Sequence, residues 1–536
     1  MRVAYSYRRE RPSGEIYIEF INKNILVKEG NYVAAVDQGT TGTRCMVFDA
    51  ESNIVGWVYE EHTQIYPMPG WVEHDPIEIW EKTRYVISET LKRSGIDPKE
   101  IVAVGVTNQR ETTVIWDAKT GRPLANAIVW QDTRTKEICE QLRKDNYEET
   151  LIHPRTGVFS FTYFSGPKIK WLLENVPGLR EKAEKGEAKF GTIDSWLIWN
   201  LTGGPDGGVH VTDYTNASRT MLMDIEKLEW NEEILELLKI PSSILPELRP
   251  SSDKSIYGYT KPDGPFKAEI PVCGDLGDQQ AALVGQVCFD RGMAKNTYGT
   301  GCFLLQNIGT KPELSKHGLL TTVAYSMEKG KCVYALEGSI AVTGAAIQWL
   351  RDNLKIISSA SETEQMARSV EQEGSGGVYF VPAFSGLFAP YWDLDARGII
   401  VGLTRFIRRE HIVHATLESI CYQTRDVLEA IASDTGSRLT ELKVDGGAVI
   451  NDYLMQLQAD ILGAKVIRPK VTETTSLGCV YAAGLAVGFW KDLDTLKKLW
   501  KVDRVFQPRW SEEKREKMYK GWRAAVERAK GWLKDL

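Results

Sequence analysis

A β-strand that runs into a turn of glycines and threonines, and then into a second strand, occurs twice in this 536-residue chain, once in each half. The first copy reads Asp37-Gln38-Gly39-Thr40-Thr41-Gly42-Thr43-Arg44, and the second reads Tyr298-Gly299-Thr300-Gly301. Glycines at such a turn let backbone N–H groups approach an anion closely. An ordinary glycine-rich turn would explain either copy alone, but the pair indicates one polyphosphate gripped between two related halves.

The remaining sequence alternates short apolar runs with helical stretches, which predicts a mixed α/β fold. Strands are expected at 34–36, 45–48, 53–59, 102–106 and 114–116, and again at 333–336, 377–380 and 442–444, with a helix at 76–94. We place the boundary between the halves so that the N-terminal domain spans 32–283 and the C-terminal domain spans 284–536. Residues 1–31 form an extension of unknown role, either an added hairpin or a disordered arm.

A third glycine-rich turn, Asp445-Gly446-Gly447, follows the expected strand at 442–444 and leads to Asn451 and a helix. Paired glycines at this switch permit a flat ring or a ribose to lie against the backbone. A tight turn that needs positive φ explains them equally well. The chain has neither a P-loop nor a dinucleotide-binding glycine fingerprint, so those two readings lose their main support.

Charge and apolar patterning exclude several partners. Lys plus Arg, 66, against Asp plus Glu, 72, gives a formal charge of -6 without long runs of either sign, which indicates neither nucleic-acid binding nor a polybasic membrane anchor. The longest uncharged stretch, 477–490, is too short to span a bilayer. The eight cysteines form no Cys-x-x-Cys pair and are expected to be reduced and buried. We expect a cytoplasmic protein that acts on small molecules.

Longer motifs resemble the FGGY family of carbohydrate kinases, and within it the members that phosphorylate glycerol. The motifs are Asp37-Gln38-Gly39-Thr40-Thr41, Thr107-Asn108-Gln109-Arg110-Glu111-Thr112-Thr113, Tyr163-Phe164-Ser165-Gly166-Pro167-Lys168, Gly277-Asp278-Gln279-Gln280, Tyr298-Gly299-Thr300-Gly301 and Gly402-Leu403-Thr404-Arg405. The resemblance implies two ribonuclease-H-like domains of the actin-like ATPase type, with the active site in the cleft between them. It covers the chain from about residue 32 onward.

The resemblance also implies the site residues and their ligands. Glycerol is expected to meet Arg110, Glu111, Trp130, Tyr163, Asp278 and Gln279. ATP is expected to meet Thr40, Thr41, Gly42, Thr43, Arg44, Thr300, Gly301, Gly344, Gln348, Gly447 and Asn451. Magnesium is expected at Asp37, through water, and at Asp278. Within this set, the Arg110 fork can hold two glycerol oxygens at once, and Trp130 offers a flat wall to a small polyol.

The implied activity is ATP-dependent phosphorylation of glycerol to sn-glycerol 3-phosphate by in-line transfer, with Asp278 as general base, feeding glycerol catabolism and lipid precursor supply. A homodimer or homotetramer is expected. Two rival functions stay open, a kinase for another polyol or ketose and an actin-like ATPase that hydrolyses ATP without an acceptor.

Each residue also has a plainer reading. Arg110-Glu111 reads as a solvated ion pair, Trp130 and Tyr163 as core, and Asp278 as the N-cap of the following helix. Whether Asp275 faces the site is open. His411 and His414 are expected at the surface.

Overall fold

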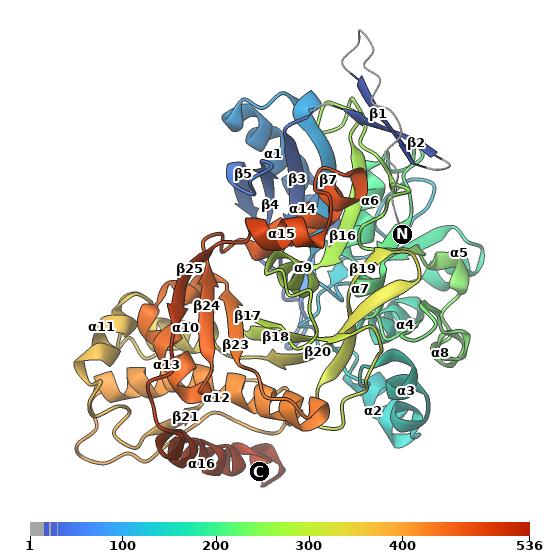
Figure 1. Ribbon diagram of the computed structural model, residues 1–536. Helices are drawn as coiled ribbons and strands as arrows, with labels where there is room; N and C mark the ends of the chain where they lie inside the picture. The colour runs from blue at the N-terminus through green and yellow to red at the C-terminus, as the bar shows by residue number, and fades with distance from the viewer. Residues whose placement is uncertain (1–14, 21–22, 29, 536) are drawn as a thin grey trace.

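The computed structural model describes residues 15–20, 23–28 and 30–535 of the chain. Two mixed sheets form its framework. In Figure 1 the first sheet, blue to green, lies above the second sheet, which runs from yellow-green to orange-red, and helix α9 lies between them. Two sheets built from two halves of one chain agree with the fold expected from the repeated turns.

The first sheet has six strands in the order β15-β16-β7-β3-β4-β5. Strands β3 (Tyr32–Gln38), β4 (Gly42–Phe48) and β5 (Ile54–Glu61) form an antiparallel meander. Strands β7 (Ile101–Asn108) and β16 (Pro271–Gly277) extend it in parallel, and β15 (Gly258–Tyr259) closes the edge antiparallel. Strands β3 and β7 are almost wholly buried, as is typical of strands covered on both faces.

The second sheet repeats this plan with one more strand, in the order β19-β20-β18-β17-β23-β24-β25. Strands β17 (Ala294–Tyr298), β18 (Cys302–Gly309), β20 (Lys331–Ile340) and β19 (Leu320–Glu328) form the antiparallel part, in which β18 pairs with β20 and β19 takes the outer edge. Strands β23 (Glu441–Asp445) and β24 (Lys465–Pro469) extend it in parallel, and β25 (Val502–Phe506) closes the edge antiparallel. The matching order and directions confirm the two related halves.

Helices α9 (Asp278–Gly285) and α14 (Thr474–Val487) pack against each other at the junction of the sheets. Helix α14 contacts β3, β7 and β16 of the first sheet, although it lies near the C-terminus of the chain (Figure 1). The two helices approach at Gly285 and Gly478, where a Cβ on Gly478 would lie 1.8 Å from the carbonyl oxygen of Ala281. Packing therefore crosses the division placed at residue 283.

The other helices and short strands cover the sheets and fill the space beside them. The helices are α1 (Pro76–Ser94), α2 (Lys136–Lys144), α3 (His153–Thr156), α4 (Ser165–Asn175), α5 (Leu179–Glu184), α6 (Ile193–Leu201), α7 (Tyr214–Ala217), α8 (Glu232–Leu238), α10 (Gly344–Asp352), α11 (Glu362–Ser369), α12 (Arg409–Thr435), α13 (Asp452–Leu462), α15 (Leu493–Leu499) and α16 (Glu512–Ala529). The short strands are β6 (Glu73–His74), β8 (Val114–Asp117), β9 (Ala127–Ile128), β10 (Ala188–Gly191), β11 (Val211–Asp213), β12 (Met223–Asp224), β13 (Glu229–Trp230), β14 (Glu247–Arg249), β21 (Tyr379–Val381) and β22 (Ile399–Val401).

The N-terminal extension contributes two strands. Strands β1 (Glu15–Phe20) and β2 (Lys23–Lys28) pair antiparallel, with Glu15 opposite Lys28, as the hairpin reading expects. Residues 1–14 of that extension lie outside the described residues. Across 15–20, 23–28 and 30–535, no helix is long and apolar enough to cross a membrane.

Candidate active site

Six side chains expected at the polyol come from the ends of two neighbouring strands and the loops beside them. Arg110 and Glu111 follow β7, and Asp278 and Gln279 follow its parallel neighbour β16, as the first residues of α9. Parallel neighbours end at the same edge of a sheet, so these residues meet there. Trp130 and Tyr163 approach from the loops that follow β9 and precede α4. The structure brings all six together.

Arg110 is buried and saturated with acceptors. Its Nη1 and Nη2 donate to the two carboxylate oxygens of Glu337 at 2.7 and 2.9 Å, and Nη1 also donates to Gln280 Oε1 at 3.1 Å. Its Nε lies 3.1 Å from Asp278 Oδ1. The expectation of a fork free to hold two glycerol oxygens is therefore wrong, and so is the reading of Arg110-Glu111 as a solvated pair, since both are buried.

Glu111 occupies a backbone conformation that only its surroundings can maintain. Its φ of 60° lies in the left-handed region, which is uncommon for a residue with a long side chain. Its carboxylate accepts from Arg219 Nε at 2.6 Å, and its carbonyl oxygen accepts from Ser165 Oγ at 3.0 Å. Burial raises the pKa of Glu111, while Arg219 and Arg110 oppose that rise. The loop after β7 is thus fixed from two sides.

An aromatic wall stands beside these charged groups. The rings of Trp130 and Tyr163 meet edge to face with centroids 5.5 Å apart, and Phe303 lies 6.2 Å from Trp130. Trp130 Nε1 donates to Thr40 Oγ1 at 2.9 Å, which ties this wall to the first glycine-threonine turn. Burial raises the pKa of Tyr163, so its hydroxyl stays protonated.

Asp278 begins helix α9 and does not cap it. Gly277 holds the N-cap position, and Asp278 Oδ1 accepts from the backbone N–H of Gln279 at 2.7 Å. The N-cap reading of Asp278 is therefore wrong. Its side chain keeps 27% exposure, the only substantial opening among the acidic groups around Arg110. Burial raises the pKa of Asp278, Arg110 and Lys295 lower it, and the charge of Asp37 raises it again.

Gln279 has a fixed amide orientation because a buried lysine occupies its oxygen. Lys295 Nζ donates to Gln279 Oε1 at 2.6 Å and to Thr297 Oγ1 at 2.9 Å. The amide Nε2 is therefore the end of Gln279 left for a ligand. Burial lowers the pKa of Lys295 to about 8.

The first glycine-threonine turn joins β3 to β4. Gly39 N–H donates to the carbonyl oxygen of Gly42 at 2.9 Å, which closes the turn. Thr41 is exposed at its tip, whereas the side chain of Thr43 is fully buried and lies in β4. Arg44 pairs with Glu473 and lies 3.7 Å from Asp37 Oδ2. Of the residues expected at ATP, Thr43 alone points its side chain into the core.

The second and third turns meet at the ends of β17 and β23. Thr300 accepts from the backbone of Thr343 and Ala345, and Gly344 N–H donates to Gly299 at 3.1 Å. A Cβ on Gly446, which has φ 92°, would lie 2.5 Å from the carbonyl oxygen of Tyr298. The structure thus gathers Thr300, Gly301, Gly344, Gln348, Gly447 and Asn451 around one edge of the second sheet.

Asn451 already has partners within the protein. Its Oδ1 caps helix α13 by accepting from the backbone of Leu454 at 2.9 Å, and its Nδ2 donates to Thr363 at 3.2 Å. Its position near the third turn does not depend on a nucleotide.

Two carboxylates, Asp37 and Asp278, were expected at magnesium. Asp37 is buried, Ser476 Oγ from α14 donates to its Oδ2 at 2.8 Å, and burial raises its pKa. The charge of Asp37 contributes to the raised pKa of Asp278, so the two carboxylates act on each other. No group of three or more His, Cys, Asp or Glu side chains that could hold a metal occurs within the described ranges.

Sequence reasoning missed four charged or polar residues of the site, namely Arg219, Lys295, Glu337 and Ser476. None belongs to a motif. Arg219, Glu337 and Ser476 reach the site from distant parts of the chain, whereas Lys295 lies 16 residues from its partner Gln279. The one available signal was for Glu337, which is the lone carboxylate in the largely apolar strand β20, after Ala335 and Leu336.

Asp275, His411 and His414 are three residues whose exposure the sequence left open or predicted. Asp275 is fully buried, and its own burial together with the charges of Asp194 and Asp213 raises its pKa well above the ordinary value. Its side chain accepts from Asn216 Nδ2 at 3.4 Å and makes no hydrogen bond or ion pair with Arg110 or Asp278. His411 and His414 were expected at the surface, and that prediction is wrong. Both are buried, because α12 is covered by α11 and α13. The eight cysteines are buried and unpaired, as predicted.

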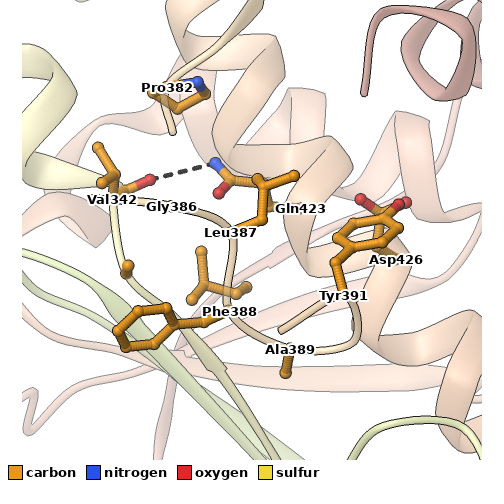
Figure 2. A pocket seen from close by; sticks show the side chains of 11 residues that line it. Val342, Pro382, Gly386, Leu387, Phe388, Ala389, Tyr391, Gln423 and Asp426 are labelled. Atoms are coloured by element: carbon orange, nitrogen blue, oxygen red, sulfur yellow. Dashed lines mark hydrogen bonds between the residues drawn. The ribbon is translucent and has the colours of Figure 1, made fainter. Parts of the chain in front are cut away.

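A small pocket lies beside the turn between β20 and α10, apart from the residues expected at the polyol and at ATP (Figure 2). Gln423 donates to the carbonyl oxygen of Val342 at 3.1 Å across it, and Tyr391 stands next to Asp426. The oxygens of Asp426 accept from Tyr519 and Trp522 at 2.7 and 2.8 Å. These polar groups hold α12 and α16 together and offer no reactive arrangement.

Comparison with known proteins agrees with this geometry. The chain is 59% identical to "Glycerol kinase 2" of Thermotoga maritima over 503 residues, 94% of this chain and 99% of that protein. It is 58% identical to "Glycerol kinase" of Roseiflexus sp. (strain RS-1) over 502 residues, with the same coverage. The crystal structure of Plasmodium falciparum glycerol kinase with ADP superimposes with a TM-score of 0.86 at 41% identity, covering 93% of this chain and 98% of that one.

More distant structures share the fold alone. The xylulose kinase of Lactobacillus acidophilus has a TM-score of 0.83 at 23% identity, covering 93% of this chain and 99% of that one. Residues 32–285 match the N-terminal domain of the FGGY family of carbohydrate kinases, and residues 294–487 match its C-terminal domain. With both domain matches and these relatives in agreement, the chain belongs to the FGGY family of carbohydrate kinases.

Proposed function

We propose that this protein phosphorylates glycerol, transferring the γ-phosphoryl group of ATP to a terminal hydroxyl and releasing sn-glycerol 3-phosphate and ADP. The observation that carries the proposal is the compact shell of Arg110, Asp278 and Gln279 beside the aromatic wall. Trp130 joins that shell to the first glycine-threonine turn through its hydrogen bond to Thr40. The names of the relatives at 58–59% identity support the same substrate.

The donors and acceptors of this shell suit a small triol. Asp278 is an acceptor, the Nε2 of Gln279 is a donor, and Trp130 and Phe303 offer apolar faces to the carbon chain. Buried polar groups that only hydroxyls satisfy discriminate against analogues that lack them.

Asp278 is our candidate for the general base. It is the partly exposed carboxylate among these charged groups, and its raised pKa brings it closer to that of a useful proton acceptor. In this proposal its Oδ2 takes the proton of the attacking hydroxyl, while Arg110 and the Gln279 N–H hold its Oδ1 in place.

We propose that the three glycine-rich turns bind ATP and that Asp37 and Asp278 hold Mg²⁺. When bound, that ion neutralises charge on the transferring phosphoryl group. Phosphoryl transfer asks the protein mainly for positioning, so no covalent nucleophile is needed.

Release of ADP by the purified protein, measured with and without glycerol, tests the function. We expect ADP release that depends on glycerol and a phosphorylated product in equal amount. ADP release at the same rate without glycerol would indicate an ATPase instead. A higher kcat/KM for xylitol or xylulose than for glycerol would identify a kinase for a longer polyol or a ketose.

A further inference from the structure

One buried carboxylate reaches the proposed polyol site from the other half of the molecule. Glu337 lies on β20 of the second sheet, is fully buried, and forms the two-pronged ion pair with Arg110 at the end of β7 in the first sheet. We propose that Glu337 is the positioning residue that orients Arg110 toward the polyol and links polyol binding to the placement of the two sheets. This inference rests on the proposed function.

The hydrogen bonds of Arg110 show what Glu337 controls. A guanidinium has five N–H groups. Glu337 accepts one from each terminal nitrogen and Gln280 accepts the second of Nη1, while Nε forms an ion pair with Asp278 at 3.1 Å. The second N–H of Nη2 makes only a long hydrogen bond, 3.5 Å, to Tyr163 Oη, which is the weakest of these contacts. The N–H that faces Tyr163 is therefore the donor that Arg110 can most readily give to a hydroxyl of the polyol, and Glu337 determines its direction.

The same contact orients the proposed base. The guanidinium of Arg110 is planar, so fixing both terminal nitrogens also fixes the position of Nε, which lies 3.1 Å from Asp278 Oδ1. A guanidinium released from Glu337 would rotate about its side chain and lose both directions together. Glu337 therefore acts through Arg110 on polyol binding and on the proposed base, Asp278, without contacting the polyol itself.

Glu337 is held as firmly as it holds Arg110. Arg219 Nη2 lies 3.4 Å from its Oε1, and Ser339 Oγ donates to the same oxygen at 3.3 Å. Burial alone would raise the pKa of Glu337, but Arg110 and Arg219 outweigh it and lower the pKa to about 2. The carboxylate is therefore charged at neutral pH.

Strand β20 makes Glu337 a link between the proposed polyol site and the proposed ATP-binding turns of the second sheet. The strand ends at Ile340, and the chain then packs Thr343 and Gly344 onto the Gly299-Thr300 turn. One continuous segment thus carries Glu337, the partner of Arg110, and also Thr343 and Gly344, which lie beside the second glycine-threonine turn. If Arg110 needed only a counter-ion, a carboxylate of the first half could have supplied it, as Glu111 does for Arg219.

The test is the substitution Glu337→Gln, which keeps the side-chain shape and removes the charge. Truncating one member of a buried, hydrogen-bonded ion pair is costly, so we expect kcat/KM for glycerol to fall by roughly 30- to 1000-fold, with a rise in KM of at least about tenfold. Because Glu337 does not touch the nucleotide turns, the Kd of ADP, measured by calorimetry, should change less than about threefold. Glu337→Asp, which keeps the charge on a shorter stem, should recover part of the loss.

A double-mutant cycle with Arg110→Lys separates positioning from general destabilisation. If Glu337 acts through Arg110, the two losses in kcat/KM should be far from additive. Asp426→Asn is the matched control, since this carboxylate is also buried in the second half but accepts from Tyr519 and Trp522 of α16 instead of Arg110, and it should lower Tm without raising the KM for glycerol.

Three outcomes would overturn the proposal: a folded Glu337→Gln or Glu337→Asp protein with a glycerol KM within threefold of wild type, losses that add in the cycle, or equal losses of ADP and glycerol affinity. The wild-type protein assayed alongside separates this from failure of the proposed function. A wild type that shows no glycerol-dependent ADP release overturns the function itself.

Discussion

Lys295 Nζ lies 2.6 Å from Gln279 Oε1, so a lysine of the second sheet decides which end of a glutamine amide faces the proposed polyol. At ordinary pH the charged ammonium makes this a charge-assisted hydrogen bond, which is about twice as strong as a neutral one. The arrangement makes substrate affinity depend on a proton that no motif in the sequence indicates.

We predict that the KM for glycerol rises above pH 8 as Lys295 loses its proton, since burial lowers the pKa of this lysine to about 8. The rise should be about three- to tenfold between pH 7 and 9, the worth of changing a charge-assisted bond to a neutral one. Lys295→Met should have a high KM that no longer changes over this range. Lys443→Met, which removes another buried lysine that lies apart from Gln279, should keep the alkaline rise.

The same lysine should affect stability in the opposite direction. Its folded pKa lies below the unfolded value near 10.5, so burying the charged form costs stability below pH 8 and this cost is relieved as pH rises toward 10.5. We expect the wild type to gain up to about 3 kcal/mol from this group across that window. Denaturant titrations of wild type and Lys295→Met at pH 7.5 and 9 measure the difference, and parallel curves would contradict the prediction.

Asp278→Asn should lower kcat by roughly 10²- to 10⁴-fold, the usual contribution of a general base. Because Gly277 holds the N-cap position, the substitution removes no helix cap, and Tm and ADP affinity should stay near wild type. Asp275→Asn, three residues earlier and fully buried, is the matched control and should keep kcat within a few-fold. If Asp278→Asn retains wild-type kcat, the base must be sought elsewhere.

A raised pKa of Asp278 also predicts the acid limb of the rate profile. Burial shifts this pKa upward, so kcat/KM should fall with decreasing pH at a higher pH than an ordinary aspartate would cause. A profile of kcat/KM from pH 4 to 8 measures it. An acid limb at or below the ordinary value of 3.8 would show that Asp278 is not the titrating group.

Binding of both substrates should close the cleft between the sheets. The proposed polyol residues belong mainly to the first sheet, and the second and third turns belong to the second, so a ligand in contact with both favours their approach. Small-angle scattering with glycerol and a non-hydrolysable ATP analogue should show a smaller radius of gyration than either ligand alone. An unchanged radius together with unchanged amide exchange would count against closure.

Gly478→Ala tests the contact between α9 and α14. The added Cβ would lie 1.8 Å from a backbone oxygen, so the helices must move apart, at a cost of roughly 1–3 kcal/mol or more. Calorimetry should show a clear fall in Tm. Gly447→Ala, where a Cβ meets nothing within 4 Å and φ is not positive, should leave Tm unchanged in the absence of nucleotide.

Local chemistry could be predicted from the sequence wherever neighbouring residues determine it. Helix α1 has the bounds expected from its periodicity, and all three glycine-rich turns follow strands as predicted. Glu337 could not be predicted, because its partner Arg110 is 227 residues away and the contact depends on how two sheets meet. The error at His411 and His414 has a similar origin, since spacing along α12 does not reveal that other helices cover it.

The position of α14 has a consequence for how the molecule is made. This helix covers β3, β7 and β16, whose residues leave the ribosome long before residues 474–487 are synthesised. Until then, one face of the first sheet has no cover, and its apolar strands resemble the exposed surfaces on which chaperones act. A nascent chain that stops before α14 therefore contains every strand of the first sheet and still lacks a finished first half.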